Sequence, residues 1–122
     1  MQYVRLYTGP DGESHFEDVE VALTPMEFAP PAPPLAVSEW TPADRVGFLG
    51  GQRGWRGEPH PTPRRQFLVW LSGHTSAQAS DGELRVLHPG DVALVEDTTG
   101  KGHTSWTEGD DPVMCLVVQL PD

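Results

Sequence analysis

The chain has 122 residues, of which 37% are hydrophobic, and this is enough for one hydrophobic core in one domain. Its 18 acidic and 8 basic side chains give a formal net charge of −10, which disfavours nucleic acid and anionic membrane surfaces as partners. Gly and Pro contribute 13 residues each, which is below the content of low-complexity disorder, so we expect a folded protein rich in turns.

The first third of the chain predicts two strands followed by an irregular segment. Gln2–Tyr7 and Phe16–Leu23 alternate polar and apolar residues on either side of a Gly-Pro-Asp-Gly turn, which predicts a hairpin or an N-terminal arm. Pro25–Pro34 contains five prolines, and we expect it to run as an extended polyproline segment that wraps over a surface. We therefore interpret residues 1–44 as an N-terminal strand arm and a proline-rich wrapping segment.

The rest of the chain predicts short strands separated by turns. Turn signals lie at Asp81-Gly82 and Pro89–Asp91. The predicted strands are Arg45–Leu49, Gln66–Ser72, His74–Ser80, Glu83–Leu87, Val92–Glu96, His103–Trp106 and Val113–Leu120. This spacing is typical of an all-β sandwich or small barrel, and we expect residues 45–120 to close into one barrel within a single domain spanning 1–122.

The strand Gln66–Ser72 has a defined phase, because successive side chains of a strand point to opposite faces. We expect Gln66, Leu68 and Trp70 to face inward. Their neighbours Phe67, Val69 and Leu71 then face outward, toward a sheet or a partner. The next strand, His74–Ser80, carries an unusually polar set of residues, so it either lines a wet pocket or lies outside in solvent.

Two segments carry a resemblance to a known family. GWRGEPHPTPRRQFLVWLSG, over Gly54–Gly73, and the later runs DGELRVLHPGDVALVED and GKGH resemble the two motifs of the cupin superfamily. They look most like a subgroup of small single-domain bacterial cupins. The resemblance covers residues 45–120 and implies a cupin-type β-barrel, a double-stranded β-helix of jelly-roll-like form. It also implies a homodimer.

The same resemblance implies a set of site residues. It places His60 and Thr62 at the two histidine positions of the first motif, Gln66 at the acidic position, and His103 at the histidine of the second motif. His60, Gln66 and His103 are therefore the candidate metal ligands. An amide oxygen is a weak neutral ligand. A divalent metal (Zn, Fe, Ni or Mn) and a metal-free pocket both stay open, as does a structural role in which Gln66 bonds a neighbouring strand.

Other candidates follow from residue type and position. Lys101, in the GKG loop, is a candidate acid or base, and so are Glu96 and Asp97 at the end of their strand, if they are partly desolvated. The candidate catalytic residues are His60, His103, Lys101 and Glu96. The candidate substrate-binding residues are Gln66, Trp70, Leu68, Trp55 and Arg64. Their structural alternatives are core filling for the tryptophans, a surface ion pair for Arg64, and a solvated loop position for Lys101.

These residues predict an enzyme of the isomerase, cyclase or lyase type. We expect acid–base or metal-assisted isomerisation, cyclisation, dehydration or decarboxylation of a small organic substrate, anionic or polyketide-like. A metal-dependent dioxygenase is the first alternative, and a non-catalytic ligand-binding or sensor protein is the second. Trp40, Trp55 and Trp106 lie outside the strand cores, which favours packing between two subunits.

The cysteine content bears on location. Cys115 stands alone, so no disulfide can form within the chain, and this favours a reducing, cytoplasmic compartment. The sequence shows no export signal and no apolar run long enough to span a bilayer. We expect Cys115 to be a buried apolar filler and not a nucleophile.

Overall fold

The computed structural model describes all 122 residues and contains strands only. With no helix in the chain, nothing in it meets the requirements for a membrane-crossing helix. The strands are β1 (Gln2–Thr8), β2 (Ser14–Glu20), β3 (Thr24–Met26), β4 (Leu35–Val37), β5 (Arg45–Gly51), β6 (Arg56–His60), β7 (Gln66–Ser72), β8 (His74–Ala79), β9 (Leu84–Leu87), β10 (Val92–Val95), β11 (His103–Glu108) and β12 (Val113–Gln119).

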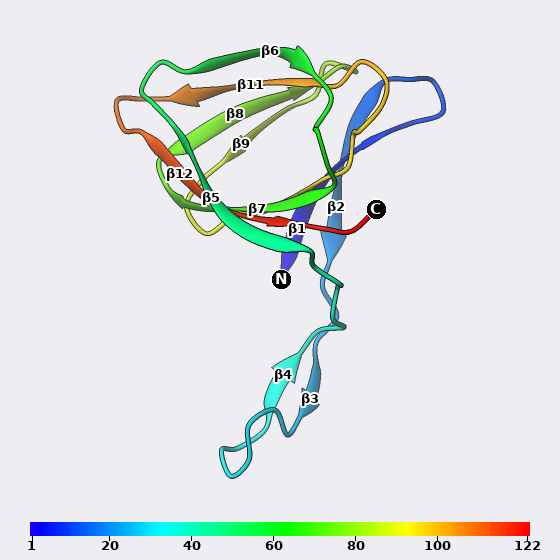
Figure 1. Cartoon of the computed structure of the whole chain (residues 1–122), viewed down its shortest axis with the longest axis vertical. Coiled ribbons are helices and arrows are strands. Elements are labelled where there is room, and N and C mark those ends of the chain that lie inside the picture. The colour runs from blue at the N-terminus through cyan, green and yellow to red at the C-terminus, as the bar shows by residue number, and fades with distance from the viewer.

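The strands form two facing sheets of a jelly-roll-like β-sandwich (Figure 1). The large sheet has the order β2-β1-β10-β7-β12-β5, and the small sheet has the order β6-β11-β8-β9. The predicted all-β, jelly-roll-like fold class is therefore confirmed, but the prediction of a closed barrel is wrong. The chain passes from β5 to β6 by changing sheets. No backbone ladder joins the edge strands of the two sheets, although Arg85 of β9 donates a side-chain hydrogen bond to Asp18 of β2 over 2.8 Å.

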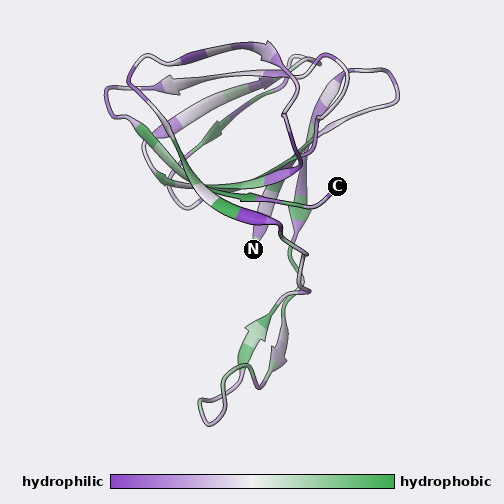
Figure 2. Cartoon of the chain, in the orientation of Figure 1, coloured by the Kyte–Doolittle hydropathy of each residue, from purple (hydrophilic) through white to green (hydrophobic).

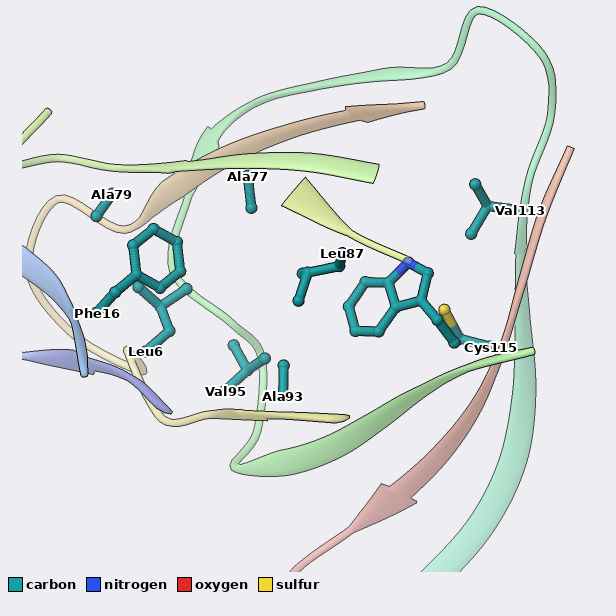
Figure 3. Packing of buried hydrophobic residues seen from close by; sticks show 10 residues of the cluster. Leu6, Phe16, Ala77, Ala79, Leu87, Ala93, Val95, Val113 and Cys115 are labelled. Carbon is teal, nitrogen blue, oxygen red and sulfur yellow. The ribbon is translucent and has the colours of Figure 1, made fainter. Parts of the chain in front are cut away.

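The core lies between the two sheets. Side chains of Ala77 and Leu87 from the small sheet point toward Ala93 and Val95 from the large sheet (Figure 3). Trp70 belongs to the same cluster, and its Nε1–H donates to the Thr75 hydroxyl over 3.0 Å. A buried indole needs such a partner for its N–H.

The predicted phase of β7 is confirmed. Leu68 and Trp70 line the space between the sheets, and Gln66 lines its mouth. On the opposite face Phe67 packs edge-on against Tyr3, and Leu71 is exposed. The structure also shows how β8 is oriented. Thr75, Ala77 and Ala79 face the core, and the more polar residues that alternate with them face away from it: His74, Ser76 and Gln78.

The N-terminal strands form the predicted hairpin, with Gln2 to Thr8 paired to Glu20 to Ser14. They are also part of the large sheet, because β1 pairs in parallel with β10 through Val4↔Ala93 and Leu6↔Val95. All other strand pairs in the protein are antiparallel. Leu6 and Phe16 thereby contribute to the core.

The proline-rich segment does not wrap over the surface, so that expectation is wrong. It forms the loop of a small hairpin, β3–β4, which projects away from the two sheets (Figure 1). Three-residue strands pair outside the main ladders, and there the prolines remove no hydrogen bond from a central strand. We call residues 21–44, which contain this hairpin, the arm.

Sequence reasoning also missed β6. Its segment, Arg56–His60, contains Pro59 and is followed by Pro61, which is typical of a loop. The strand is tolerated because β6 lies at the edge of the small sheet, where only one side of the backbone must pair.

Candidate active site

Two histidines meet where β6 and β11 pair. His103 begins β11 and lies directly opposite His60 of β6, with ring centroids 5.2 Å apart. The residue before it, Gly102, has φ +72° and lies so close to the His60 backbone that no Cβ fits there. Glycine at this position therefore allows the GKG loop to bring His103 beside His60.

A buried carboxylate orients the His103 ring. Asp97 is completely inaccessible to solvent, and its Oδ2 lies 2.6 Å from His103 Nδ1. The carboxylate accepts the Nδ1–H, which leaves the Nε2 lone pair of the neutral ring free. The Asp97 backbone is fixed as well, because its carbonyl accepts the Thr62 N–H. This geometry suits an imidazole that takes up and returns a proton.

The second carboxylate oxygen of Asp97, Oδ1, is buried and has no hydrogen-bond partner in the protein. An unsatisfied buried polar atom costs free energy, so such atoms are retained chiefly where they serve a purpose or where water reaches them. This unpaired oxygen belongs to the same carboxylate that binds His103.

The His60 side chain lies at the rim. Its Nδ1 is 2.8 Å from the Pro61 carbonyl, and since a carbonyl only accepts, Nδ1 carries the proton. Trp55 lies over Gly57, the residue opposite Ser105, and a Cβ there would collide with the indole. The Trp55 indole and the His60 imidazole therefore lie on the same side of the space between the sheets.

Glu96, a predicted catalytic residue, does not join the histidines. Its carboxylate binds Arg5 Nε at 2.6 Å and Arg65 Nε at 2.7 Å. Burial raises the pKa of Glu96, but hydrogen bonds and charges from the two arginines outweigh it and hold the pKa below its ordinary value. Glu96 thus serves as a charged clamp between β1 and the segment before β7.

The period of β10 explains why Asp97 is the carboxylate at the site. Ala93 and Val95 face the core, so the next residue of that face is Asp97, whereas Glu96 falls on the other face. This alternation is visible in the sequence and is the signal that distinguishes Asp97 from Glu96 as the carboxylate of the site.

Lys101 also lies away from the histidines. Its ammonium binds Glu13, and this hydrogen bond raises the pKa of Lys101. The residue is exposed and its backbone N–H donates to the Gly12 carbonyl. Arg64, predicted to bind substrate, pairs with Asp44 at 2.8 Å and donates to the Leu120 carbonyl. Both side chains hold loops in place, and neither of them lines the cavity that lies between the two sheets.

Gln66 belongs to a chain of hydrogen bonds at the mouth. Its Oε1 accepts from Gln119 Nε2 at 2.9 Å, and Gln119 Oε1 accepts from Arg45 Nε at 2.6 Å. Its own amide N–H₂ donates to Thr62 at 3.4 Å. The amide is therefore fixed by neighbouring strands, as the structural alternative for Gln66 predicts.

The donor set at the mouth consists of two imidazoles and one neutral amide oxygen. His60 and His103 each have a free Nε2, and the Gln66 oxygen, which accepts one hydrogen bond from Gln119, is a weak uncharged ligand. No group of three or more His, Cys, Asp or Glu side chains in the chain is arranged to hold an ion. Two imidazoles with a neutral amide bind a divalent ion more weakly than a set that includes a carboxylate, so the reaction proposed below uses the side chains alone.

The histidines open onto a cavity between the sheets. The inner cavity has a volume of about 190 Å³, and a wider mouth of about 640 Å³ adjoins it. The two share the lining residues Leu49, Trp55, Leu68, Val95, His103 and Ser105. The predicted binding residues Trp55, Leu68 and Trp70 line the inner cavity, and Gln66 lines the mouth.

The character of the lining changes from inside to outside. The inner part is mostly aliphatic and aromatic, and small residues such as Ala77 and Ala93 leave the space open. Its polar groups are few: His103, Ser105 and Thr107 lie along β11, and Thr75 is paired with Thr107. Arg45 is the one formally charged residue that lines the mouth. The arrangement fits an apolar molecule with one polar end, which is how small-ligand pockets generally combine apolar area with few polar groups.

Cys115 is expected to react slowly in the native protein. It lines the inner cavity but is almost completely buried, and burial raises the pKa of its thiol from 9.0 to about 11. The thiolate is the reactive form, so at pH 8 iodoacetamide should alkylate native protein about 100-fold more slowly than protein unfolded in urea. Mass spectrometry measures this cleanly because the chain has a single cysteine. Equal rates in both states would contradict the burial of the thiol.

Comparison with known proteins leaves the family open. No protein-family model and no curated protein matches the sequence. Solved structures do match: a protein from Neisseria meningitidis has 12% identity and a TM-score of 0.47, covering 62% of this chain and 72% of that one. A conserved protein of unknown function from Streptococcus pyogenes has 18% identity and a TM-score of 0.48, covering 63% of this chain and 64% of the streptococcal one, which is less than two thirds.

A third structure spans the whole chain. A putative ethanolamine utilization protein from Salmonella typhimurium has 17% identity and a TM-score of 0.41, and the alignment covers 99% of this chain and 96% of that one. All three TM-scores lie below 0.5. The description of fold and site therefore rests on the strand order and the side-chain geometry above.

Proposed function

We propose that the protein binds a small, largely apolar organic molecule between its sheets and moves a proton on it through His103. The observation that carries the proposal is the Asp97–His103 hydrogen bond of 2.6 Å, made by a carboxylate with no solvent access. The carboxylate stabilises the imidazolium that forms when Nε2 accepts a proton. His103 lines both the inner cavity and the mouth, so that nitrogen has access to a bound molecule.

The substrate class follows from the lining. An aromatic or alicyclic ring system suits the inner cavity, and a carbonyl at the His103 end places an adjacent C–H near Nε2. Removing that proton gives an enolate and an imidazolium, and the Ser105 hydroxyl, two residues along β11, can donate to the enolate oxygen. Isomerisation, cyclisation, dehydration and decarboxylation all use such an enolate. Arg45 at the mouth favours a substrate with an anionic group there.

We also propose that the chain is a small single-domain member of the cupin superfamily in which two of the usual ligand positions have changed. The support is that His60, Gln66 and His103, the residues matched to the two cupin motifs, all line one mouth. The neutral amide of Gln66, a weak ligand, favours metal-independent chemistry over the dioxygenase alternative, since dioxygenases need an iron site with firm ligands.

The experiment follows exchange of an α-proton for deuterium. 1-Tetralone, an apolar bicyclic ketone, is incubated with protein in D₂O and the loss of the proton signal next to the carbonyl is measured by ¹H NMR. Wild-type protein should accelerate exchange by about 100-fold relative to His103→Gln, because glutamine cannot carry a proton at neutral pH. His88→Gln is the matched control, since His88 is largely exposed and lines neither part of the cavity.

The outcomes separate enzyme from binding protein. Equal exchange rates for wild type and His103→Gln, with ketone binding shown by chemical-shift changes, would assign the cavity to ligand binding without catalysis. Failure of apolar ring ketones to bind at all would contradict the proposed substrate class.

A further inference from the structure

Three loops meet where β11 begins. They are the β1–β2 turn over residues 9–13, the β8–β9 turn over residues 80–83, and the segment over residues 96–102 that joins β10 to β11. In Figure 1 the blue β1–β2 turn lies beside the gold segment that leads into β11. All three loops are hydrophilic, and the β1–β2 turn shows no green in Figure 2. Hydrogen bonds, and not apolar packing, therefore hold the three loops together.

The Ser14 side chain lies at this junction. Ser14 begins β2 and is completely inaccessible to solvent. Its Oγ accepts the Ser80 N–H over 2.7 Å, and its hydroxyl donates to the Gly102 carbonyl over 2.7 Å. The Ser80 hydroxyl in turn accepts the Ser14 N–H over 2.7 Å. One buried hydroxyl thus satisfies a backbone donor and a backbone acceptor from two different loops.

The register of β8 and β11 shows what this hydroxyl replaces. His103 pairs with Ala79, so the next pair of the antiparallel ladder would be Gly102 with Ser80. Ala79 directs its N–H and carbonyl into the β8–β9 turn, and Ser80, as the next residue, directs its N–H toward β11. That N–H does not bond the Gly102 carbonyl directly, because Ser14 Oγ stands between the two groups and bonds both. The first residue of β2 therefore supplies the last connection of the ladder, one residue before His103.

We propose that Ser14 is a positioning residue for His103. The inference rests on the proposed function, in which His103 moves the proton. The Gly102 carbonyl belongs to the same planar peptide unit as the His103 nitrogen, so the hydrogen bond from Ser14 fixes the plane through which the chain enters β11. Glycine at φ +72° does not fix that plane by itself, because its backbone has more freedom than that of other residues. With the plane fixed, the His103 ring stays within hydrogen-bond distance of Asp97.

The other side-chain contacts of the β1–β2 hairpin act on earlier parts of the same segment. The Thr8 hydroxyl donates to the Thr99 carbonyl over 2.8 Å, and the Lys101 ammonium binds Glu13. Both of these hydrogen bonds are exposed to solvent, where water competes with them, whereas the hydrogen bond donated by the Ser14 hydroxyl is buried. Ser14 thus provides the contact that is nearest to the start of β11 and least accessible to water.

The test compares Ser14→Ala with Ser80→Ala in the full-length chain. Each substitution removes one serine hydroxyl from the same junction, but the Ser80 hydroxyl bonds the Ser14 N–H and not the Gly102 carbonyl. We expect both variants to fold, each with a lower urea midpoint than the wild type, since each loses a hydrogen bond. Only Ser14→Ala should change the behaviour of His103.

The first measurement is the proton exchange of 1-tetralone. Exchange should be about 10-fold slower in Ser14→Ala than in the wild type, because a small misplacement of a catalytic group lowers the rate. Ketone affinity should be unchanged, since Ser14 lines neither part of the cavity. Ser80→Ala should keep both the rate and the affinity of the wild type.

The second measurement needs no substrate. In ¹⁵N spectra of the imidazoles at pH 8, the wild-type His103 ring should carry its proton on Nδ1, and Ser80→Ala should keep this preference. Ser14→Ala should show a mixture of the two tautomers. A mixture in Ser14→Ala together with no exchange activity in the wild type would support the positioning role and contradict the proposed reaction.

Three results would overturn the positioning role. They are an unchanged His103 tautomer in folded Ser14→Ala, an exchange rate in that variant equal to the rate of an active wild type, and an equal change of tautomer in Ser80→Ala. If Ser14→Ala does not fold, Ser14→Cys takes its place, because a thiol has nearly the same shape and is a weak donor. That variant should change the tautomer in the same direction, and a wild-type spectrum would overturn the proposal.

Discussion

Gly102→Ala is expected to destabilise the protein by more than about 4 kcal/mol, an effect at the upper end for single substitutions. Gly102 has φ +72°, and an L-residue in that region costs roughly 1–2 kcal/mol. The added Cβ would also overlap the His60 carbonyl carbon and oxygen and the Pro61 nitrogen, which are backbone atoms and cannot rotate away. The β6–β11 pairing that joins the two histidines must separate to accept the methyl group.

The matched control is Gly12→Ala. Gly12 has φ +81° in the β1–β2 turn, and no atom lies within 4 Å of a Cβ built there. It therefore isolates the cost of positive φ, and urea unfolding should show a loss of only about 1–2 kcal/mol. Similar losses for the two variants would mean that the GKG loop moves easily and that Gly102 does not fix the position of His103.

Asp97→Asn is expected to lower the rate of proton exchange by about 100-fold or more. The amide has the shape of the carboxylate but carries no charge, so it stabilises the imidazolium of His103 far less when Nε2 accepts a proton. ¹⁵N spectra of the imidazoles report on the orientation directly. Wild-type protein at pH 8 should carry the His103 proton on Nδ1, and this preference should be lost in Asp97→Asn.

Glu96→Gln is the matched control, because it removes the charge of the carboxylate that precedes Asp97 in the sequence. Glu96 points to the other face of β10 and binds Arg5 and Arg65, so this variant should lose stability while the folded protein keeps its exchange rate and its His103 tautomer. An Asp97→Asn protein with an unchanged exchange rate would show that His103 works without a charged partner.

The sequence predicted the central strands well because their phase is a local property. The alternation within Gln66–Ser72 is strong and its ends are marked, and both its bounds and its inward face agree with the structure. The same logic was available for Asp97, since it follows Ala93 and Val95 on one face of β10. The sequence alone leaves Glu96 and Asp97 both as candidates, because it does not show that Arg5, 91 residues earlier, binds the Glu96 carboxylate.

Long-range features were less accessible. Whether facing sheets close into a barrel depends on hydrogen bonds between strand edges, and residue patterns do not encode which edges meet. Pro59 and Pro61 concealed β6, although an edge strand tolerates them. The prolines correctly predict that their segment is not a central strand. They do not predict that the β3–β4 hairpin projects away from the two main sheets, because its strands pair only with each other.

The parallel pairing of β1 with β10 constrains how the chain can fold. The β1–β2 hairpin is complete within the first 20 residues, yet its other edge pairs with Val92–Val95. During synthesis the free edge of β1 stays unpaired until most of the chain has emerged. Leu6 and Phe16 stay without their core neighbours for the same period. Such a high contact order predicts slow folding, with an early hairpin that offers an unpaired edge to other nascent chains. A complete cavity thus requires the N-terminal hairpin to pair with β10, a strand formed much later in the chain.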